Sequence, residues 1–374
     1  MFGSKKYDYL IVGSGIFGAT FAHLAKQWGK KCLVLERRDV VGGNCYTKNI
    51  DGINVHMYGP HIFHTNNKDV WDFVNSLVEF NDFKLNVLAN YNNKIYHLPF
   101  NMNTFYELRG ITSPEDAMRY IEVATRDEPQ NPKNLEEQAI KLVGCEIYNT
   151  LIKGYTEKQW GRDCKDLPSD IIKRLPIRYT FDNNYFKEGR YQGVPKNGYT
   201  ELFKKLLNGI EVQCGVDYLK NKKYYDSLAK KVVYTGKVDE YFNYCYGELE
   251  YRTVKWDMEH LENTPNFQGA AVINYTNKDV PFTRIIEHKH FDTFGDDVYK
   301  IPKTIISREY SVEWKPGMEG YYPIKDARNT ELYNRYKALC EKEKNVIFGG
   351  RLAEYQYYDM NNIIENLLKI KETI

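Results

Sequence analysis

The sequence lacks the features that mark secreted, membrane-spanning or nucleic-acid-binding proteins. Its seven cysteines are scattered, odd in number and without a CxxC pair, which argues against a disulfide framework or a zinc site. No apolar run approaches the ~20 residues that a helix needs to cross a bilayer, and the N-terminus has no cleavable secretory pattern. The 52 basic and 50 acidic residues leave a net charge of +2, too little to attract nucleic acid or an acidic membrane. We therefore expect a cytoplasmic protein with reduced thiols.

The length and composition are those of a folded protein. Of the 374 residues, 42% are hydrophobic and 27% are charged, which indicates two or three globular domains. The 32 tyrosines are unusually many. A tyrosine ring offers a flat apolar face and a hydroxyl, so the surplus suits a sugar or nucleotide pocket. Replacement of phenylalanine in the protein cores explains the same surplus, and both interpretations stay open.

The N-terminal segment predicts a parallel βαβ unit. Tyr7–Val12 is a short apolar run, as in a buried strand. A stretch with helical spacing begins at Phe17 and stops at Gly29, and Cys32–Glu36 reads as a second buried strand. A strand, a glycine-rich turn, a helix and a strand in this order are typical of the Rossmann fold. We therefore expect a protein of the α/β class.

The turn in this unit, GSGIFG at Gly13–Gly18, matches the GxGxxG pattern of dinucleotide-binding proteins. Its glycines allow the tight turn, the approach of a pyrophosphate and the packing of helix on strand, while unpaired helix amides face the phosphates. Glu36 ends the next strand, where a carboxylate accepts hydrogen bonds from ribose hydroxyls. Ordinary tight turns also match the pattern, but this context predicts a dinucleotide site.

The following segment favours FAD over NAD. The basic pair Arg37 and Arg38 follows the acidic residue, and Gly42–Asn44 (GGN) comes shortly after. This order is usual where a chain passes under an extended FAD. Near the C-terminus, Phe348–Leu352 (FGGRL) ends a predicted strand in Gly-Gly, which often brings backbone amides to the flavin or its ribityl chain. We therefore predict FAD as the cofactor.

The remaining chain divides into a helical and a β-rich part. Between residues 101 and 178, amphipathic stretches begin at the capping residues Ser113 and Asn134 and predict a helical insert. Between residues 185 and 310, the runs KVVYTG, GELEYRTVKWDME, GAAVINYT and KTIISREYSVEW look like antiparallel strands. A strand, a glycine turn and a last helix then complete the chain. The simplest organisation is a discontinuous nucleotide domain interrupted by these two parts.

Long segments outside the glycine turn carry a more specific signal. They are YGPHIFHT (58–65), LPFNMNTF (98–105), GYTEKQWGR (154–162), IIKRLPIRYTFDNNYF (171–186), YQGVPKNGYT (191–200), NFQGAAVINYT (266–276), FTRIIEHKHF (282–291), YYPI (321–324) and GGRLAEYQYYDM (349–360). With these segments the chain resembles bacterial UDP-galactopyranose mutases along essentially its whole length. The resemblance implies a homodimer and a mixed α/β fold in three parts. The parts are a discontinuous Rossmann-like FAD-binding domain (1–80, 195–240 and 325–374), a helical bundle (100–180) and a twisted antiparallel sheet domain (81–99, 181–194 and 241–324).

The resemblance also implies an isomerase without net redox change. Such an enzyme interconverts UDP-galactopyranose and UDP-galactofuranose by ring contraction and supplies furanose for cell-surface polysaccharide. Reduced FAD acts as the nucleophile at the anomeric carbon, so no side-chain triad is needed. The protein has to hold the diphosphate leaving group, orient the sugar and exclude water. The implied partners are the nucleotide sugar and a reductant such as NAD(P)H or a flavodoxin-like donor, with neither nucleic acid nor membrane.

The matched segments imply roles for individual residues. Arginines suit a diphosphate because their planar fork donates in pairs, and an aromatic ring stacks on a pyrimidine for ~1–3 kcal/mol. The implied substrate-binding residues are Tyr155, Thr156, Trp160, Arg174, Tyr185, Asn274, Arg284, Tyr322 and Tyr357. The implied cofactor-binding residues are Gly13, Ser14, Gly15, Phe17, Gly18, Glu36, Arg37, Gly43, Asn44, His61, His64, Arg351, Asp359 and Met360. The implied catalytic residues are Arg174, Arg284 and His64. Taken alone, the arginines also read as surface residues, the tyrosines as structural and Trp160 as a helix core residue, and Tyr321 is the near alternative to Tyr322.

The histidines do not predict a metal site. His61 and His64 form an HxxH pair, but the sequence offers no third ligand at a suitable spacing, and the resemblance places this segment beside the flavin. A histidine there donates a hydrogen bond to the cofactor. His288 and His290, in the strand-like run EHKH, would point to opposite faces and could not bind one ion together. We expect these two histidines to be structural and the protein to bind no metal.

The likeness weakens near residue 80. Galactose-specific members usually read FNRFTNSP there, whereas this chain has Asp82 in place of the arginine and Leu85–Val87 in place of the amide-serine-proline stretch. A leucine in place of a polar contact fits a sugar that lacks a hydroxyl or carries an acetamido methyl. UDP-N-acetylgalactosamine and a dTDP-6-deoxyhexose are therefore alternative substrates. A flavin oxidoreductase and a non-catalytic flavin-binding scaffold are further alternatives, and the matched arginines argue against both.

Overall fold

The computed structural model describes residues 5–128, 130–172, 176–187 and 189–370. The chain folds into two compact units. Unit 1 consists of Met1–Asp82, Gly189–Tyr251 and Glu319–Ile374, and unit 2 consists of Phe83–Glu188 and Arg252–Met318. None of the helices in the described part of the chain is both long enough and apolar enough to cross a membrane.

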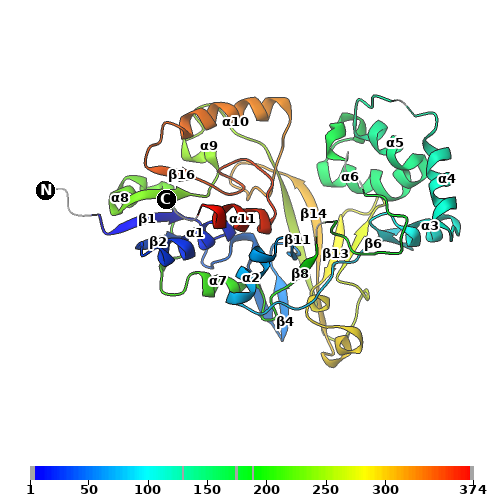
Figure 1. Cartoon of the computed structure of the whole chain (residues 1–374), viewed down its shortest axis with the longest axis horizontal. Coiled ribbons are helices and arrows are strands. Elements are labelled where there is room, and N and C mark those ends of the chain that lie inside the picture. Colours follow the sequence, from blue (N-terminus) through cyan, green and yellow to red (C-terminus); the bar gives the residue numbers. More distant parts are fainter. Residues whose placement is uncertain (1–4, 129, 173–175, 188, 371–374) are drawn as a thin grey trace. The chain divides into compact units, whose positions relative to one another are not determined.

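Unit 1 is built around a five-stranded sheet with the order β16-β10-β1-β2-β9. All of its neighbouring strands are parallel. The strands are β1 (Tyr7–Val12), β2 (Cys32–Leu35), β9 (Glu211–Gln213), β10 (Ala229–Tyr234) and β16 (Val346–Phe348). Their central members are almost wholly apolar, which suits a parallel sheet covered on both faces. Figure 1 shows that β16, from the end of the chain, belongs to the same sheet as the N-terminal strands.

In the described part of unit 1, seven α-helices and several short strands complete the fold. The helices are α1 (Ile16–Gln27), α2 (Lys68–Leu77), α7 (Tyr199–Leu206), α8 (Lys222–Leu228), α9 (Val238–Tyr241), α10 (Ala327–Cys340) and α11 (Met360–Lys369). The short strands are β3 (Thr47–Ile50), β4 (Ile53–His56), β5 (Phe63–Thr65), β8 (Tyr191–Gly193) and β15 (Tyr322–Pro323). Strand β3 pairs with β4, and β5 pairs with β8, both antiparallel. The β5–β8 pair matters for the site because it carries His64 opposite Gln192.

The prediction that KVVYTG forms an antiparallel strand is wrong. This run is β10, which lies parallel to both β1 and β16 in the central sheet of unit 1. Val232 and Val233 pair there with Leu10 and Ile11. A run of β-forming residues shows that a strand is favoured, but neither its partner nor its direction.

Unit 2 contains a sheet with the order β11-β14-β13-β12-β6-β7. Its strands are β6 (Val87–Tyr91), β7 (Lys94–Leu98), β11 (Tyr251–Leu261), β12 (Val272–Tyr275), β13 (Arg284–Glu287) and β14 (Thr304–Glu313). The pairs are antiparallel, except that β6 and β12 run parallel. The predicted antiparallel sheet therefore contains one parallel pair.

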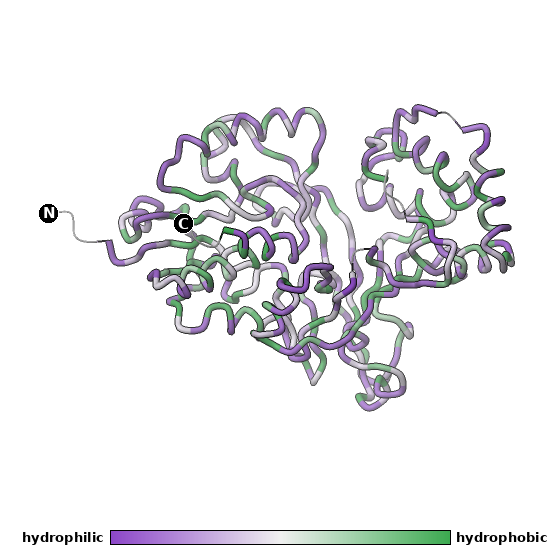
Figure 2. The backbone as a smooth tube through the Cα atoms, viewed as in Figure 1, coloured by the Kyte–Doolittle hydropathy of each residue, from purple (hydrophilic) through white to green (hydrophobic). Residues whose placement is uncertain are grey.

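The helices of unit 2 are α3 (Met102–Arg109), α4 (Pro114–Thr125), α5 (Leu135–Ile147) and α6 (Lys153–Trp160), with a π-helical turn at Tyr148–Ile152. Ser113 and Asn134 cap α4 and α5 as predicted, since their side chains accept from the backbone N–H of Asp116 and Glu137. Along these helices hydrophilic and hydrophobic segments alternate (Figure 2). Their apolar faces bury Phe105, Ala139 and other side chains in one core, and a fully buried large apolar side chain contributes roughly 1.5–3 kcal/mol.

Candidate active site

The glycine turn of unit 1 has the geometry that a dinucleotide site needs. Gly13 follows β1 with a φ of 102°, and its backbone N–H donates to Leu35 O over 2.8 Å. A Cβ on Gly18 would lie only 2.0 Å from Gly13 O, so the start of α1 packs directly on the turn. Helix α1 begins after Gly15, which has no side chain to cap the first amides. These amides form a site for an anion.

Glu36 lies beside this turn, as predicted. It is buried, and its Oε2 accepts from Ser14 N–H over 2.9 Å and from Ser14 Oγ over 2.6 Å. Its Oε1 accepts from Arg38 N–H over 2.9 Å. The carboxylate therefore joins the end of β2 to the glycine turn. A contact with the ribose stays a prediction.

The two arginines that follow Glu36 point in different directions. Arg37, which sequence reasoning assigned to the cofactor, pairs with Glu319 at 3.0 Å and with Glu240 at 3.8 Å. Arg38 instead donates from Nη2 to Asn44 Oδ1 over 2.9 Å. Among the residues that the structure describes, its Nη1 is buried without a hydrogen-bond partner.

Arg38 Nη2 also lies 3.5 Å from Glu319 Oε2, which leaves the Nη1 side of its guanidinium for a further acceptor. Such a donor in the same segment as the glycine turn fits a pyrophosphate cofactor. Sequence reasoning missed Arg38 because a basic pair does not show which member turns inward. The guanidinium of Arg38 also lies over the Tyr58 ring at 4.2 Å, which fixes its direction further.

A second group of predicted residues meets in unit 1 after β16. His64 Nε2 lies 4.0 Å from Asp359 Oδ2, and Arg351 lies over the Tyr357 ring at 4.8 Å. The Tyr357 and Tyr322 rings stack with centroids 6.0 Å apart. Tyr357 is half exposed, but crowding by the protein around its ring and the neighbouring Asp359 carboxylate raise the pKa of its phenol, so the hydroxyl stays protonated as a hydrogen-bond donor.

His61, Met360 and Tyr321 also make contacts within unit 1. His61 Nδ1 lies 2.8 Å from Gly59 O. Cys45 Sγ lies 3.5 Å from Met360 Sδ, which joins the segment after Asn44 to the start of α11. Tyr321, the alternative to Tyr322, is buried, and its carbonyl accepts from Arg351 Nη1 over 3.4 Å. A contact of His61, Asn44 or Met360 with the flavin stays a prediction.

In unit 2, one row of side chains crosses three strands. Asn274 on β12 pairs in register with Arg284 on β13, and Arg284 pairs with Glu309 on β14. Paired residues point to the same face of a sheet. Arg284 donates from Nε over 2.8 Å and from Nη2 over 2.5 Å to Glu309 Oε2. Thr283 Oγ1 donates to the other carboxylate oxygen over 2.8 Å. Glu309 is thus a buried support that orients the predicted phosphate-binding arginine.

Tyr185 belongs to the same group. Crowding raises the pKa of its phenol, and the positive charge of Arg284 acts in the opposite direction, which shows that the two side chains are close. The backbone N–H of Tyr185 donates to Leu85 O over 2.8 Å. The segment that departs from galactose-specific sequences therefore contacts a predicted substrate residue. Leu85 itself is buried. Arg174, the second predicted arginine, lies outside the described residues.

Helix α6 carries Tyr155, Thr156 and Trp160. Thr156 is buried, and Trp160 packs partly against the core of the helices. Its neighbour Lys158 donates from Nζ to the carbonyls of Tyr275 and Phe282 over 2.7 and 2.9 Å. These carbonyls follow Asn274 and precede Arg284 along the chain, so α6 lies against the hairpin that carries both residues.

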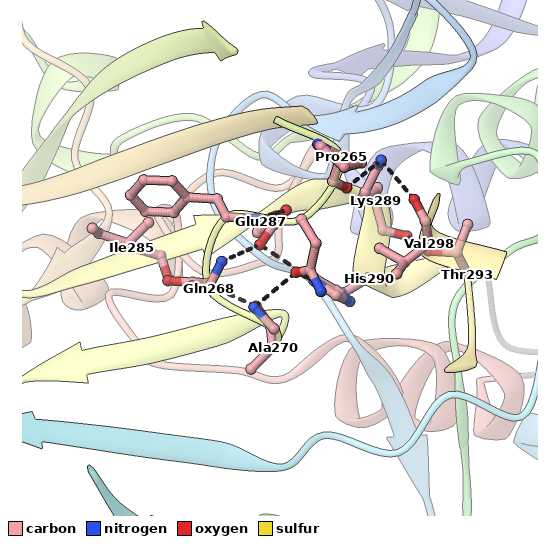
Figure 3. Close-up of polar contacts among 12 residues, drawn as sticks. Pro265, Gln268, Ala270, Ile285, Glu287, Lys289, His290, Thr293 and Val298 are labelled. Atoms are coloured by element: carbon pink, nitrogen blue, oxygen red, sulfur yellow. Dashed lines mark hydrogen bonds and ion pairs between the residues drawn. The ribbon is translucent and has the colours of Figure 1, made fainter. Parts of the chain in front are cut away.

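The prediction that EHKH is strand-like is wrong for its last three residues. Strand β13 ends at Glu287, and His288–Phe291 form a 3-10 helical turn. Buried bonds hold the turn. Lys289 Nζ donates to the carbonyls of Pro265 and Val298 over 2.7 and 2.9 Å (Figure 3). It also donates to the carbonyl of Ile301 over 2.8 Å. His288 lies 2.8 Å from Ser307 Oγ and His290 lies 3.2 Å from Glu287, so both have structural partners. Within the ranges that the structure describes, no three His, Cys, Asp or Glu side chains are grouped as metal ligands.

The fold and the site define the class of the protein as a Rossmann-type flavin-binding enzyme. In unit 2, Glu309 orients Arg284, the arginine predicted to bind the phosphates. The family model described as UDP-galactopyranose mutase matches residues 150–357, and one for an NAD(P)-binding Rossmann-like domain matches residues 11–77. The chain belongs to the UDP-galactopyranose mutase family. It is therefore an isomerase, and its cofactor is FAD.

Full-length relatives carry two different substrate names. The chain is 36% identical over 368 residues to the dTDP-fucopyranose mutase of Escherichia coli, with 96% of each protein covered. It is 37% identical over 367 residues to a probable UDP-galactopyranose mutase of Klebsiella pneumoniae, covering 97% of this chain and 93% of that protein. A crystal structure of reduced UDP-galactopyranose mutase shares the fold with a TM-score of 0.72 and 13% identity, covering 98% of this chain and 95% of that one. The mixed α/β fold is confirmed.

Proposed function

We propose that this protein interconverts the pyranose and furanose forms of a pyrimidine-nucleotide hexose, with UDP-galactose as the first substrate. The observation that carries this proposal is the row Asn274–Arg284–Glu309, which lies against the helix that bears Tyr155 and Trp160. An oriented guanidinium suits a diphosphate, and flat rings suit a pyrimidine. Family membership agrees with a ligand of this composition.

The leaving group of the reaction is a nucleoside diphosphate, and this chain's arginines would hold it. Glu309 engages two of the five N–H donors of a guanidinium along one edge. Such a fixed orientation costs nothing at the moment of reaction, so the charge of Arg284 can stabilise the diphosphate as it departs. We propose that Arg174 assists it, and that Tyr185, Tyr322 and Tyr357 donate hydroxyl hydrogen bonds to the phosphates.

The pyrimidine would be recognised by α6 and by Asn274. We propose that Trp160 and Tyr155 form the stacking wall. In the part of unit 2 that the structure describes, Asn274 Oδ1 is buried without a hydrogen-bond partner. A buried amide oxygen without a partner is costly, and a donor on the nucleotide would remove that cost.

FAD would be held by the glycine turn, Glu36, Asn44 and the inward-facing Arg38 of unit 1. When bound in its reduced form, FAD supplies the nucleophile that replaces the diphosphate at the anomeric carbon. We propose that His64, beside Asp359, donates a hydrogen bond on the flavin side. The chain's own part is to bind the leaving group, to orient the sugar and to exclude water.

A dTDP-6-deoxyhexose is the second candidate substrate, and two observations favour it. The Escherichia coli relative at 36% identity is a dTDP-fucopyranose mutase. The atypical segment Asp82–Val87 holds the backbone of Tyr185 through Leu85 O. Because the Leu85 side chain is buried, we propose that this segment selects the sugar through the position of Tyr185. UDP-N-acetylgalactosamine stays the third candidate.

A substrate panel tests the proposal. Dithionite-reduced and oxidised protein would each be incubated with UDP-galactofuranose, its N-acetylated relative and a dTDP-6-deoxyhexofuranose, and the pyranose products separated by chromatography. We expect turnover of at least one substrate by the reduced protein alone. Equal turnover by the oxidised protein would contradict the reduced flavin as nucleophile, and no turnover of any substrate would contradict the mutase proposal.

We further propose that the protein is a cytoplasmic homodimer and that its furanose product enters cell-surface polysaccharide. NAD(P)H or a flavodoxin-like donor would keep the flavin reduced. Light scattering of the purified protein tests the dimer, and anaerobic bleaching of the flavin absorbance by each donor tests the reductant. A monomeric mass, or bleaching by neither donor, would overturn the respective proposal.

A further inference from the structure

Helix α6 is held to the hairpin formed by β12 and β13 by a half-buried lysine. Lys158 Nζ donates to Tyr275 O over 2.7 Å and to Phe282 O over 2.9 Å. Tyr275 comes directly after Asn274, and Phe282 comes two residues before Arg284. One side chain therefore joins the helix that carries Tyr155 and Trp160 to the end of β12, which carries Asn274, and to the segment just before β13, which carries Arg284.

The same helix packs on this hairpin without intervening side chains. A Cβ on Gly154 would lie 2.2 Å from Thr276 O and 2.9 Å from Lys278 N, so only glycine allows this approach. Thr276 Oγ1 donates to Thr150 O over 2.7 Å, just before α6 begins. Lys278 pairs with the buried Glu157 at 2.9 Å. Backbone contact therefore brings α6 close to one side of the hairpin's loop at Thr276, and Lys158 holds the helix to both sides of that loop, at Tyr275 and at Phe282.

Stability alone does not account for a lysine at this position. Burial lowers the pKa of Lys158 to about 8, which means that the charged amine is disfavoured there. An apolar side chain of similar length would avoid that cost, although both carbonyls would lose this donor. One carbonyl ends β12 and the other lies in the segment just before β13, so the distinctive contribution of the amine is geometric.

We propose that Lys158 is a positioning residue that sets the distance between the base-binding helix and the phosphate-binding strand. The substrate's pyrimidine and diphosphate are covalently joined, so both can be bound at full strength only when the protein groups stand at the matching distance. The inference rests on the proposed function, because it assumes that a nucleoside diphosphate occupies these groups.

The test compares a whole nucleotide with one of its fragments. Lys158→Met should weaken the binding of UDP or dTDP about tenfold, measured by titration of tryptophan fluorescence. Binding of inorganic pyrophosphate, measured by competition, should change less than about twofold, because a fragment that contacts only the arginine does not depend on the spacing. KM for the nucleotide sugar should rise with the Kd, while kcat and FAD content stay near those of the unaltered protein. Lys158→Arg, which keeps charged donors, should restore part of the affinity.

Lys289→Met is the matched control, since Lys289 also donates to backbone carbonyls but lies outside the proposed site. It should lower the melting temperature and leave the UDP affinity unchanged. Unchanged UDP binding in Lys158→Met would overturn the inference. An equal loss for UDP and pyrophosphate would also overturn it, because it would mean general damage to the arginine strand. If the unaltered protein binds neither UDP nor dTDP, the proposed function itself fails, and this inference fails with it.

Discussion

The two ends of strand β13 differ in how their charged side chains are bonded. We call the end at Arg284 the near end, and the end at Glu287, with the turn that follows it, the far end. At the far end, Glu287 accepts from the backbone N–H groups of Phe267 and Gln268 over 2.9 and 2.8 Å, with the His290 side chain 3.2 Å away, and Lys289 donates to three backbone carbonyls. At the near end, Arg284 is held by another side chain, Glu309. Asn274 Oδ1, in the next strand, has no partner within the described residues.

This contrast separates structural from functional polar groups better than burial does. A charge whose hydrogen bonds all go to the main chain fixes loops in place, and a ligand would have to break those bonds to reach it. A charge oriented by a second side chain presents its remaining surface in a defined direction. The near end of β13 is therefore the end at which we expect ligand chemistry, and the far end is the one at which we expect stability.

The largest effect should come from the far end. In Lys289→Met, three buried carbonyls lose their donor, at ~1 kcal/mol or more each. We expect the free energy of unfolding to fall by roughly 3 kcal/mol, measured by denaturant titration, with KM unchanged. A rise in KM without a loss of stability would reverse the assignment of the two ends.

Arg284→Ala should have the next largest effect, on catalysis rather than on stability. Loss of the guanidinium should lower kcat/KM at least a hundredfold, about 2.7 kcal/mol of barrier. The FAD absorbance should persist, because the residues proposed to hold the cofactor belong to unit 1 and Arg284 belongs to unit 2. Near-normal turnover in this variant would remove Arg284 from the site.

The far end should also be sensitive to acid. Burial lowers the pKa of His288 from 6.5 to about 3, against a smaller opposite effect of Glu287. Between these values only the unfolded chain takes up the proton, so stability falls as the pH drops below 6.5 and stops falling near 3. At pH 5 the loss should be roughly 2 kcal/mol. His288→Gln keeps a donor near Ser307 but has no imidazole to protonate. Its free energy of unfolding, compared at pH 7 and pH 5, should therefore not show this loss. An identical pH dependence in both proteins would contradict the assignment.

The fold was predictable where the signal was local. The run Tyr7–Val12 forms β1 with those bounds, and Ser113 and Asn134 cap helices as their side chains indicated. The direction of β10 and the turn at His288 were mispredicted, because each depends on partners far away in the sequence. Strand β10 finds its neighbours more than 200 residues before it and more than 100 after it, as in Val232 with Leu10 and Val346.

The candidate site follows the same rule. The glycine turn and Glu36 were recognisable because their spacing within one βαβ unit is characteristic. Glu309 was missed, because nothing in the run REYSV shows that this residue pairs with Arg284 on the neighbouring strand. Lys158 lies inside the matched segment GYTEKQW, yet its carbonyl partners are more than 110 residues away, at Tyr275 and Phe282. Register and close packing, rather than residue type, determine these roles.

The smallest effect should come from Glu309→Gln. This variant tests whether the near end of β13 is functional because Arg284 is oriented there by another side chain. Glutamine keeps an acceptor for Arg284 but removes the charge, so the arginine stays in place and is held less firmly. We expect kcat/KM to fall about tenfold, or ~1.4 kcal/mol, with little change in the melting temperature. Glu287→Gln is the control, because the same change at the far end should lower the melting temperature and leave kcat/KM near normal. If both variants alter kcat/KM equally, the type of partner does not distinguish the two ends. If only Glu309→Gln does, the orientation of Arg284 by a buried carboxylate is part of how this protein holds its leaving group.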